Sequence, residues 1–215
     1  EFNKTTGAFS LKTPIVITEA AQVSGGLPLG SLGNVGDYAV IALENYNAPT
    51  ATTGKQFFVK GTDNVWKPLG SEDWLMNVPA VQGTESNPTI SGGTITLDLG
   101  NGVDATISPG VSASSCATAI NNLNWGGVSA AVNGSGQLEI YSAQAGQPGV
   151  TNQYIAISGT GTALADLGIA SGTYYQPLVS YGTAAQMPLW QTGQAYPRPT
   201  GSVWIKVGSS GNGLV

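Results

Sequence analysis

Short segments in which apolar and polar residues alternate fill the middle of this chain, and this period of two predicts β-strands. Each segment is bounded by Gly, Asn or Ser. The tripeptide Gly100-Asn101-Gly102 predicts a tight hairpin, because Asn and Gly tolerate positive φ. A second hairpin and one further strand follow the same pattern. The predicted strands are residues 94–99, 103–107, 128–132, 137–142 and 153–158.

An earlier region shows a β pattern with more aromatic and β-branched residues. Residues 36–43 (GDYAVIAL) and 55–61 (KQFFVKG) predict two strands, and a third is expected near Val65 and Trp66. Their order predicts a small antiparallel meander. Pro88 marks the end of this region, because proline interrupts a sheet and restricts the residue before it.

A helical period of apolar residues lies between the two predicted hairpins. Ser112 is the expected N-cap, and Val111 is expected to pack on Cys116 as a hydrophobic staple. Because so short a helix is unstable alone in water, we expect it to cover one sheet made by both hairpins. The residues of its expected buried face are Ala113, Cys116, Ala117 and Ile120.

These patterns together predict a mainly β protein, a β-rich α+β fold of antiparallel modules with two short helices. The second helix is expected at 162–168, with Thr162 as its N-cap and Gly168 after its last turn. We divide the chain into an N-terminal lead-in (1–26), a small antiparallel β module (27–85), a β/α module (86–176), and an extended Pro-rich linker with the start of a further β module (177–215).

Composition narrows the class of protein. Only 9% of the 215 residues are charged, 41% are hydrophobic, and the net charge is −5, so the basic surface that a nucleic-acid binder needs is not expected. No apolar run is long enough to predict insertion into a membrane. The single cysteine, Cys116, predicts no intrachain disulfide. Because the chain begins at Glu1 and not at Met, we expect it to be part of a longer polypeptide.

Catalytic and metal-binding signals are weak. The chain has no His, which excludes Ser-His-Asp and Cys-His sites and His-based metal sites. Cys116 has no basic neighbour and lies on the apolar helix face, which indicates a core thiol. Asp98, Asn101 and Asp104 cluster around a predicted hairpin turn, where turn formation is a better interpretation than a weak Ca²⁺ site. We therefore expect neither an enzyme nor a bound cofactor.

The order of hairpin, helix, hairpin, strand and helical turn resembles the flagellin hook IN motif. That family is named for an Ile-Asn pair, which here is Ile120-Asn121. The matching residues are Ala119 to Asn121, Val128 to Val132, Leu138 to Ser142 and Leu167 to Ile169, and the resemblance covers about 80 residues.

The resemblance implies a structural protein. Such modules occur in flagellins, in flagellar hook-associated proteins, and in tail and other virion proteins of tailed bacteriophages. Flagellins flank the module with long heptad-like helices, and this chain has no Leu-rich charged stretch of that kind. The resemblance therefore favours a phage virion protein over a flagellin.

A segment near the start of the chain and a segment near its end show a weak sequence similarity. Residues 27–43 and 187–207 share a Pro-Leu pair, a polar stretch, a glycine and a strand with an aromatic residue. The segment from Gly36 to Val40 matches the segment from Gly201 to Ile205. If this similarity reflects a repeat, a β module flanks the IN-like module on both sides, as suits an elongated virion part.

Aromatic residues are the remaining functional candidates. Most tryptophans in small β domains lie in a core or an interface, although exposed ones can stack on sugars. Trp190 and Tyr196 lie in a Pro-rich segment, and we expect them to contact a neighbouring subunit in preference to a glycan. The structural and interface candidates are Ile120, Asn121, Trp66, Trp74, Trp190, Tyr196 and Trp204.

We therefore expect a non-enzymatic structural component of a tailed phage, placed in the tail tube, sheath or fibre of the extracellular virion. Low charge and open strand edges suit a chain that assembles with copies of itself and with other virion proteins. Three alternatives remain open. They are a flagellar hook-associated or adhesin-like secreted protein, a receptor- or carbohydrate-binding fibre domain with a host surface glycan as partner, and a polysaccharide-degrading enzyme.

Overall fold

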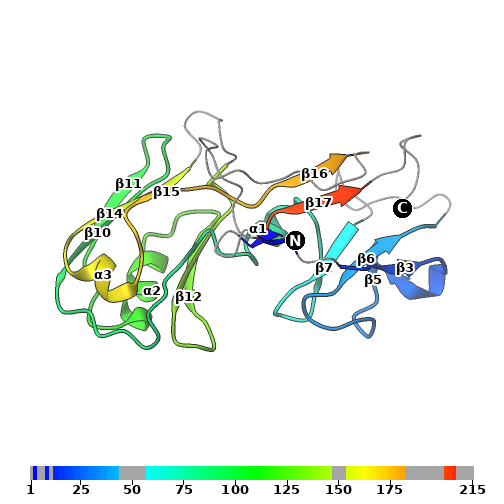
Figure 1. Ribbon diagram of the computed structural model, residues 1–215, viewed down its shortest axis with the longest axis horizontal. Coiled ribbons are helices and arrows are strands. Elements are labelled where there is room, and N and C mark those ends of the chain that lie inside the picture. The colour runs from blue at the N-terminus through cyan, green and yellow to red at the C-terminus, as the bar shows by residue number, and fades with distance from the viewer. Residues whose placement is uncertain are drawn as a thin grey trace.

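The computed structural model describes residues 2–3, 8–9, 12–43, 57–146, 154–182 and 201–206. Its elements are short strands in several mostly antiparallel sheets, with three α-helices of at most nine residues among the described residues. The predicted fold class, mainly β with short helices, is confirmed. Figure 1 shows an N-terminal body built from β3 to β8 with α1, a central body built from β9 to β15 with α2 and α3, and the strand pair β16–β17.

A four-stranded sheet forms the N-terminal body. The predicted meander is confirmed, because β6, β7 and β8 pair antiparallel in that order. A fourth strand, β3, pairs parallel with β6 and joins Ile15 to Ala39. The sheet order is β3 (Ile15–Ile17), β6 (Tyr38–Ile41), β7 (Phe57–Lys60) and β8 (Trp66–Pro68).

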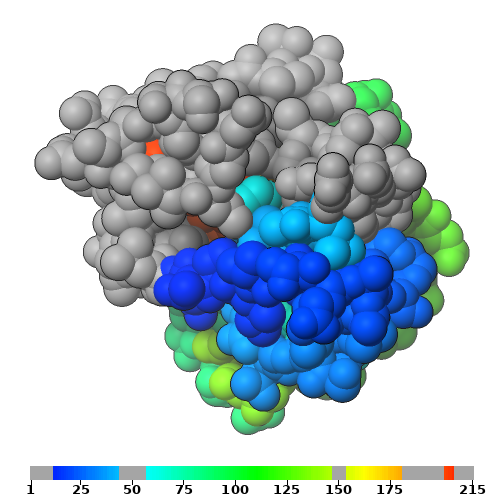
Figure 2. Space-filling view, turned by 90° about the vertical axis from the view of Figure 1, so that its right-hand side faces the viewer, coloured from blue at the N-terminus to red at the C-terminus, as the bar shows by residue number. Residues whose placement is uncertain are grey.

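Both faces of this sheet are covered. One face packs under the connection between β3 and β6, which holds η1 (Ala20–Gln22), β4 (Val23–Ser24) and β5 (Leu27–Pro28). Ile17, Ile41 and Phe58 lie at the centre of this outer core and are fully buried. In Figure 2 residues 12–43, in blue, form a broad band across the surface at this end of the molecule.

The opposite face of the sheet borders a second core, here called the junction core. Tyr38 enters it from β6, and Trp74 and Leu75 enter it from α1 (Glu72–Leu75). Val203 and Ile205 enter it from β17 (Val203–Lys206), which pairs parallel with β16 (Val179–Gly182). Since Ala143 of the central body also packs against this cluster, the junction core connects all three parts of the chain.

Lys60 is a buried lysine that closes the outer core. Its side chain is 3% exposed, and its ammonium group donates to the carbonyl oxygens of Gly30 (2.7 Å), Leu32 (2.8 Å) and Gly33 (2.9 Å). Its Nζ also lies 5.7 Å from the centroid of the Trp66 ring, within the range of a cation–π contact. Three backbone acceptors and an aromatic face thus replace the water that the charge loses on burial.

Two sheets and two helices make the central body. One sheet has the order β11 (Asp104–Ile107), β10 (Gly93–Asp98), β14 (Ile155–Gly161), β15 (Gly172–Tyr174). The other has the order β12 (Val128–Val132), β13 (Leu138–Ser142), β9 (Val81–Gln82). A shared core contains residues of both sheets, of α2 (Ala113–Asn121) and of α3 (Ala163–Leu167).

The expectation of one sheet made by both hairpins was wrong. The hairpin β10–β11 pairs onward with β14, whereas the hairpin β12–β13 pairs onward with β9. The helix α2 packs against β12 and β13. A single period-two pattern does not say which hairpin pairs with which other strand, because both hairpins offer an apolar face. We had placed a module boundary between residues 85 and 86. The strand β9 lies before that boundary but pairs with β13, which belongs to the module after it.

The start of α2 is partly as expected. Ser112 is the N-cap, and its hydroxyl oxygen accepts the Ser115 N–H at 3.2 Å, while Ser115 Oγ accepts the Ser112 N–H at 2.9 Å. The expected staple between Val111 and Cys116 is wrong, because Val111 is 72% exposed. A bridge from Thr89 to Ser112 and a bond from the Ile90 N–H to the Val111 carbonyl hold this turn instead.

Smaller elements complete the fold. β1 (Phe2–Asn3) and β2 (Ala8–Phe9) form a two-stranded antiparallel pair. The predicted helix α3 ends as expected at Gly168, which adopts φ of 65° in the left-handed region. Thr162 stands at its N-cap position, but its hydroxyl donates to Asp166 Oδ2 and makes no capping bond to a backbone N–H.

Replacing Lys60 with Met tests the buried ammonium. The variant keeps the apolar stem but leaves three carbonyl oxygens without their donor, so we expect a loss of about 2–3 kcal/mol in the free energy of unfolding, measured with urea. The matched control is Lys67→Met, which keeps the apolar stem and breaks the ion pair to Asp63. Because the Asp63 side chain is half exposed and its carboxylate can be hydrated, this change should cost less than about 1 kcal/mol. Equal losses in the two variants would contradict the role given to Lys60.

Candidate functional site

The Ile-Asn pair at the end of α2 joins the helix to the core and to a sheet edge. Ile120 is 2% exposed and packs in the core of the central body with Ala113, Cys116 and Ala117, as the helical spacing predicts. The next residue, Asn121, lies about 100° further round the helix and faces β12.

Asn121 binds the backbone of one residue of β12 with both ends of its side-chain amide. Its Oδ1 accepts the Ala130 N–H at 2.8 Å, and its Nδ2 donates to the Ala130 carbonyl at 2.9 Å. In the described sheet β12 is an edge strand, paired with β13 alone. A neighbouring strand would bind the same N–H and C=O, so the side chain of Asn121 substitutes for one residue of that strand.

This arrangement caps a strand edge. Unpaired backbone groups along an edge strand favour pairing with another chain, and proteins commonly block them. Asn121 blocks the edge of β12 at its middle residue and fixes the distance between α2 and the sheet. The pair therefore has a structural role. Ile120 packs in the core, and Asn121 caps the edge of β12.

Trp66 is buried in the outer core. Its ring is 2% exposed, and its Nε1–H donates to the Leu29 carbonyl at 3.0 Å. This bond ties β8 to the connection that covers the sheet. A ring enclosed on this side by Lys60 and the covering connection has no free face for a sugar.

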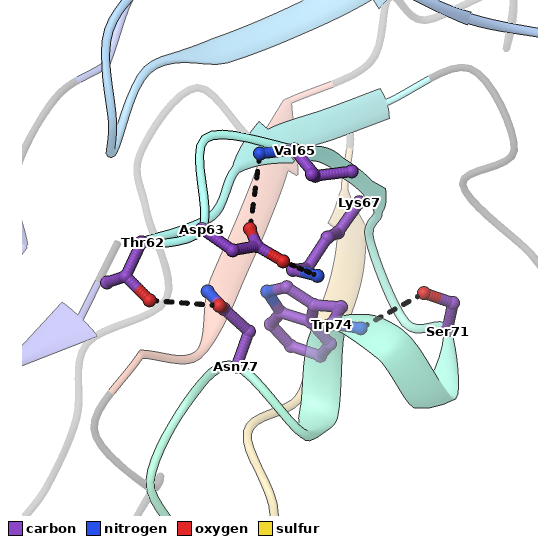
Figure 3. Close-up of polar contacts among 7 residues, drawn as sticks. All are labelled: Thr62, Asp63, Val65, Lys67, Ser71, Trp74 and Asn77. Carbon is purple, nitrogen blue, oxygen red and sulfur yellow. Dashed lines mark hydrogen bonds and ion pairs between the residues drawn. The ribbon is translucent and has the colours of Figure 1, made fainter. Parts of the chain in front are cut away.

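Trp74 is buried in the junction core, also at 2% exposure. Figure 3 shows it on α1, beside the turn between β7 and β8. The Ser71 hydroxyl oxygen accepts the Trp74 N–H at 3.2 Å and caps the helix. On the turn, Thr62 Oγ1 donates to Asn77 Oδ1 at 3.3 Å, so the hairpin end is linked to the segment after α1.

Asp63 and Lys67 form the ion pair at the same hairpin turn. Lys67 Nζ lies 2.8 Å from Asp63 Oδ2, and Asp63 Oδ1 accepts the Val65 N–H at 3.1 Å. Partial burial by itself would raise the pKa of Asp63. The hydrogen bonds from Lys67 and Val65, with the positive charge of Lys67, outweigh that effect and lower the pKa.

Of the remaining tryptophans, two are described and both are half-buried. Trp204 lies on β17 and is half-buried. Trp190 and Tyr196 lie outside the described residues, so their expected contact with a neighbouring subunit stays a prediction. Trp125 is half-buried and packs against the core of the central body.

Two polar side chains at the first hairpin turn stabilise that turn, and the single thiol is buried. Asp98 Oδ1 accepts the Gly100 N–H at 2.6 Å, and Asn101 Oδ1 accepts the Val103 N–H at 3.2 Å, so both side chains stabilise the predicted hairpin turn. Within the described ranges, no three His, Cys, Asp or Glu side chains come together as metal ligands would. Burial raises the pKa of the Cys116 thiol to about 12, which keeps it protonated and unreactive.

Asp166 on α3 holds the segment that leads into β10. Its Oδ2 accepts the Ser91 N–H at 2.7 Å and the Thr162 hydroxyl at 2.8 Å. The Ser91 N–H is the main cause that lowers the pKa of Asp166, and Thr162 adds to it. The sequence indicated a helical turn here but gave no sign of the contact between Asp166 and Ser91, which are far apart in the sequence.

Comparisons of the chain with protein-family models, with curated proteins and with solved structures found no match. The resemblance to the hook IN motif therefore depends on the residues themselves. Among the described residues, no helix has the length and apolar character needed to span a bilayer.

Replacing Asn121 with Ala tests the edge cap. The Ala130 N–H and C=O lose their partners, so we expect a loss of about 1–2 kcal/mol in the free energy of unfolding, measured with urea. Asn122→Ala is the matched control, because Asn122 is the exposed C-cap residue and no side-chain hydrogen bond holds it. A loss no greater than that of the control would show that the Asn121 amide does not hold β12.

Replacing Asp166 with Asn tests the acid sensitivity of the α3 contact. A folded-state pKa below the ordinary 3.8 means that the carboxylate stabilises the fold above about pH 3.8, and that this stability is lost as the pH falls through the lowered pKa. The urea midpoint of Asp166→Asn should therefore fall less steeply than that of the wild type below about pH 4. Parallel curves for the two proteins would contradict the prediction.

Proposed function

We propose that this chain is a structural component of a tailed bacteriophage particle, placed in the tail and acting by assembly. The observation that carries the proposal is the Ile120-Asn121 pair, in which one side chain fills the core and the next caps the edge of β12. The pair that gives the hook IN motif its name thus has a mechanical role in this chain, as a structural module requires.

The positions of the tryptophans support assembly over glycan binding. Trp66 and Trp74 lie in two different cores, where they hold strands and α1 together. Neither ring offers the open face on which a sugar stacks. Tryptophan side chains that are used to join small sheets suit a structural protein.

The division of the chain into small sheets also supports a role in assembly. Small sheets with few strands have a large share of edges, and edges are where subunits of an assembly pair. The junction core connects the three parts through Trp74, Val203 and Ala143. A chain of short modules joined by shared cores is suited to an elongated particle.

Immunogold electron microscopy tests the proposal. Antibodies against the full chain should label the tails of tailed particles purified from the source culture, and mass spectrometry of the same particles should find its peptides. A matched control uses antibodies absorbed beforehand with the purified chain. Label on flagellar filaments with none on particles would overturn the proposal in favour of a hook-associated protein.

A further inference from the structure

The sequence contains Asn-Gly pairs that begin at Asn101, Asn133 and Asn212, and the last of them lies outside the described residues. An Asn that precedes Gly is chemically labile. The backbone nitrogen of the Gly can attack the side-chain carbonyl carbon of the Asn, and glycine has no side chain to hinder the approach. In both described pairs the Gly N–H makes no hydrogen bond, so the pairs differ in what holds the Asn side chain.

Asn133 is held firmly at the turn between β12 and β13. Its Oδ1 accepts the N–H groups of Ser135 at 2.9 Å and of Gln137 at 3.0 Å. Its Nδ2 donates to Gln137 Oε1 at 3.1 Å and to Glu139 Oε1 at 3.0 Å, and the residue is half-buried. Attack on the side-chain carbon turns the amide out of this position and finally removes Nδ2. The reaction therefore has to break all four hydrogen bonds.

Asn101 is held far less firmly at the tip of the β10–β11 hairpin. Asn101 and Gly102 are both exposed, and Asn101 Oδ1 accepts the Val103 N–H at the longer distance of 3.2 Å. Among the described residues no acceptor binds the Nδ2 of Asn101. The amide can therefore turn toward the Gly102 nitrogen when a single long hydrogen bond breaks.

We propose that Asn101 is a site of spontaneous deamidation, a reaction that consumes water and needs no enzyme. The Gly102 nitrogen forms a bond to the side-chain carbon of Asn101. The bond from that carbon to Nδ2 breaks, and Nδ2 leaves as ammonia with the proton of the Gly102 nitrogen. Water then opens the resulting succinimide ring by adding a hydroxyl group to one ring carbonyl and a hydrogen to the ring nitrogen. The products are aspartate and isoaspartate.

The reaction changes the charge and the backbone of the hairpin tip. Asp98 and Asp104 already lie opposite each other where the two strands meet the turn. The product adds a third carboxylate between them in the sequence, and like charges so close together destabilise a strand pair. The isoaspartate product also adds one carbon atom to the main chain of the turn. The site does not depend on a phage origin, so its failure and a failure of particle labelling are separate results.

Incubation of the full chain in mildly alkaline buffer tests the site, because alkali favours loss of the proton from the Gly102 nitrogen. Chymotrypsin then separates the two sites, since Trp125 lies between them, and mass spectrometry follows each peptide. We expect Asn101 to convert at least about tenfold faster than Asn133. The same measurement in urea is the control. The unfolded chain lacks the hydrogen bonds of both side chains, so the two sites should convert at similar rates.

Variants of the full chain test the cause of the difference. Glu139→Ala removes one acceptor of the Asn133 Nδ2 group and should raise the rate at Asn133 at least about threefold. Tyr141→Phe is the matched control, because it removes the hydroxyl that donates to Glu139 Oε2 and keeps the bonds of Asn133. It should leave the Asn133 rate unchanged. Circular dichroism checks that both variants fold, and the wild-type comparison stands even where one does not.

Three results would overturn the proposal. The first is an equal rate at Asn101 and Asn133 in the folded chain. The second is conversion of Asn101 in urea with none in the folded chain, because the hairpin would then protect it. The third is an unchanged rate at Asn133 in a folded Glu139→Ala chain, because side-chain hydrogen bonds would then not decide which pair reacts.

Discussion

Every short sheet in this chain has edges, and the backbone N–H and C=O groups along those edges need partners. The structure meets this need with side chains as well as strands. Asn121 binds both backbone groups of Ala130 at the edge of β12, and Lys60 gathers three carbonyl oxygens of the connection that covers β3 and β6. Two polar side chains thereby add specific bonds to the apolar packing that holds a helix and a loop against these short sheets.

Apolar packing connects the N-terminal body, the central body and β17. The outer core and the core of the central body each belong to one body, whereas the junction core takes residues from both bodies and from β17. Tyr38 of β6 and Val203 of β17 both belong to that core. Side-chain packing in the junction core therefore holds the described parts of the chain together.

Local patterns in the sequence predicted the elements well, and contacts between distant residues poorly. The Asn-Gly hairpin, the Ser112 cap and the buried face ending at Ile120 all depend on neighbours within a few residues, and the structure confirms them. The partner of each hairpin, the cap at Ala130 and the carbonyl cluster at Lys60 depend on which segments meet in space. Asn121 lies outside the apolar face, so the helical periodicity gave no sign of its contact with β12. For α1 the signal was present, since Ser71 precedes two acidic residues, but its short length hid it.

Amide hydrogen exchange of the full chain, followed residue by residue in solution, tests the central claim most directly. The Asn133 N–H donates to the Gln137 carbonyl, toward the partner strand, so the N–H groups of Ala130 and Val132 both point to the other edge of β12. Asn121 binds the N–H of Ala130, and among the described residues no side chain binds that of Val132. The account predicts slow exchange at the Ala130 amide, similar to that of residues between two strands, and fast exchange at the Val132 amide. Fast exchange at Ala130, or equal protection at both positions, would contradict it.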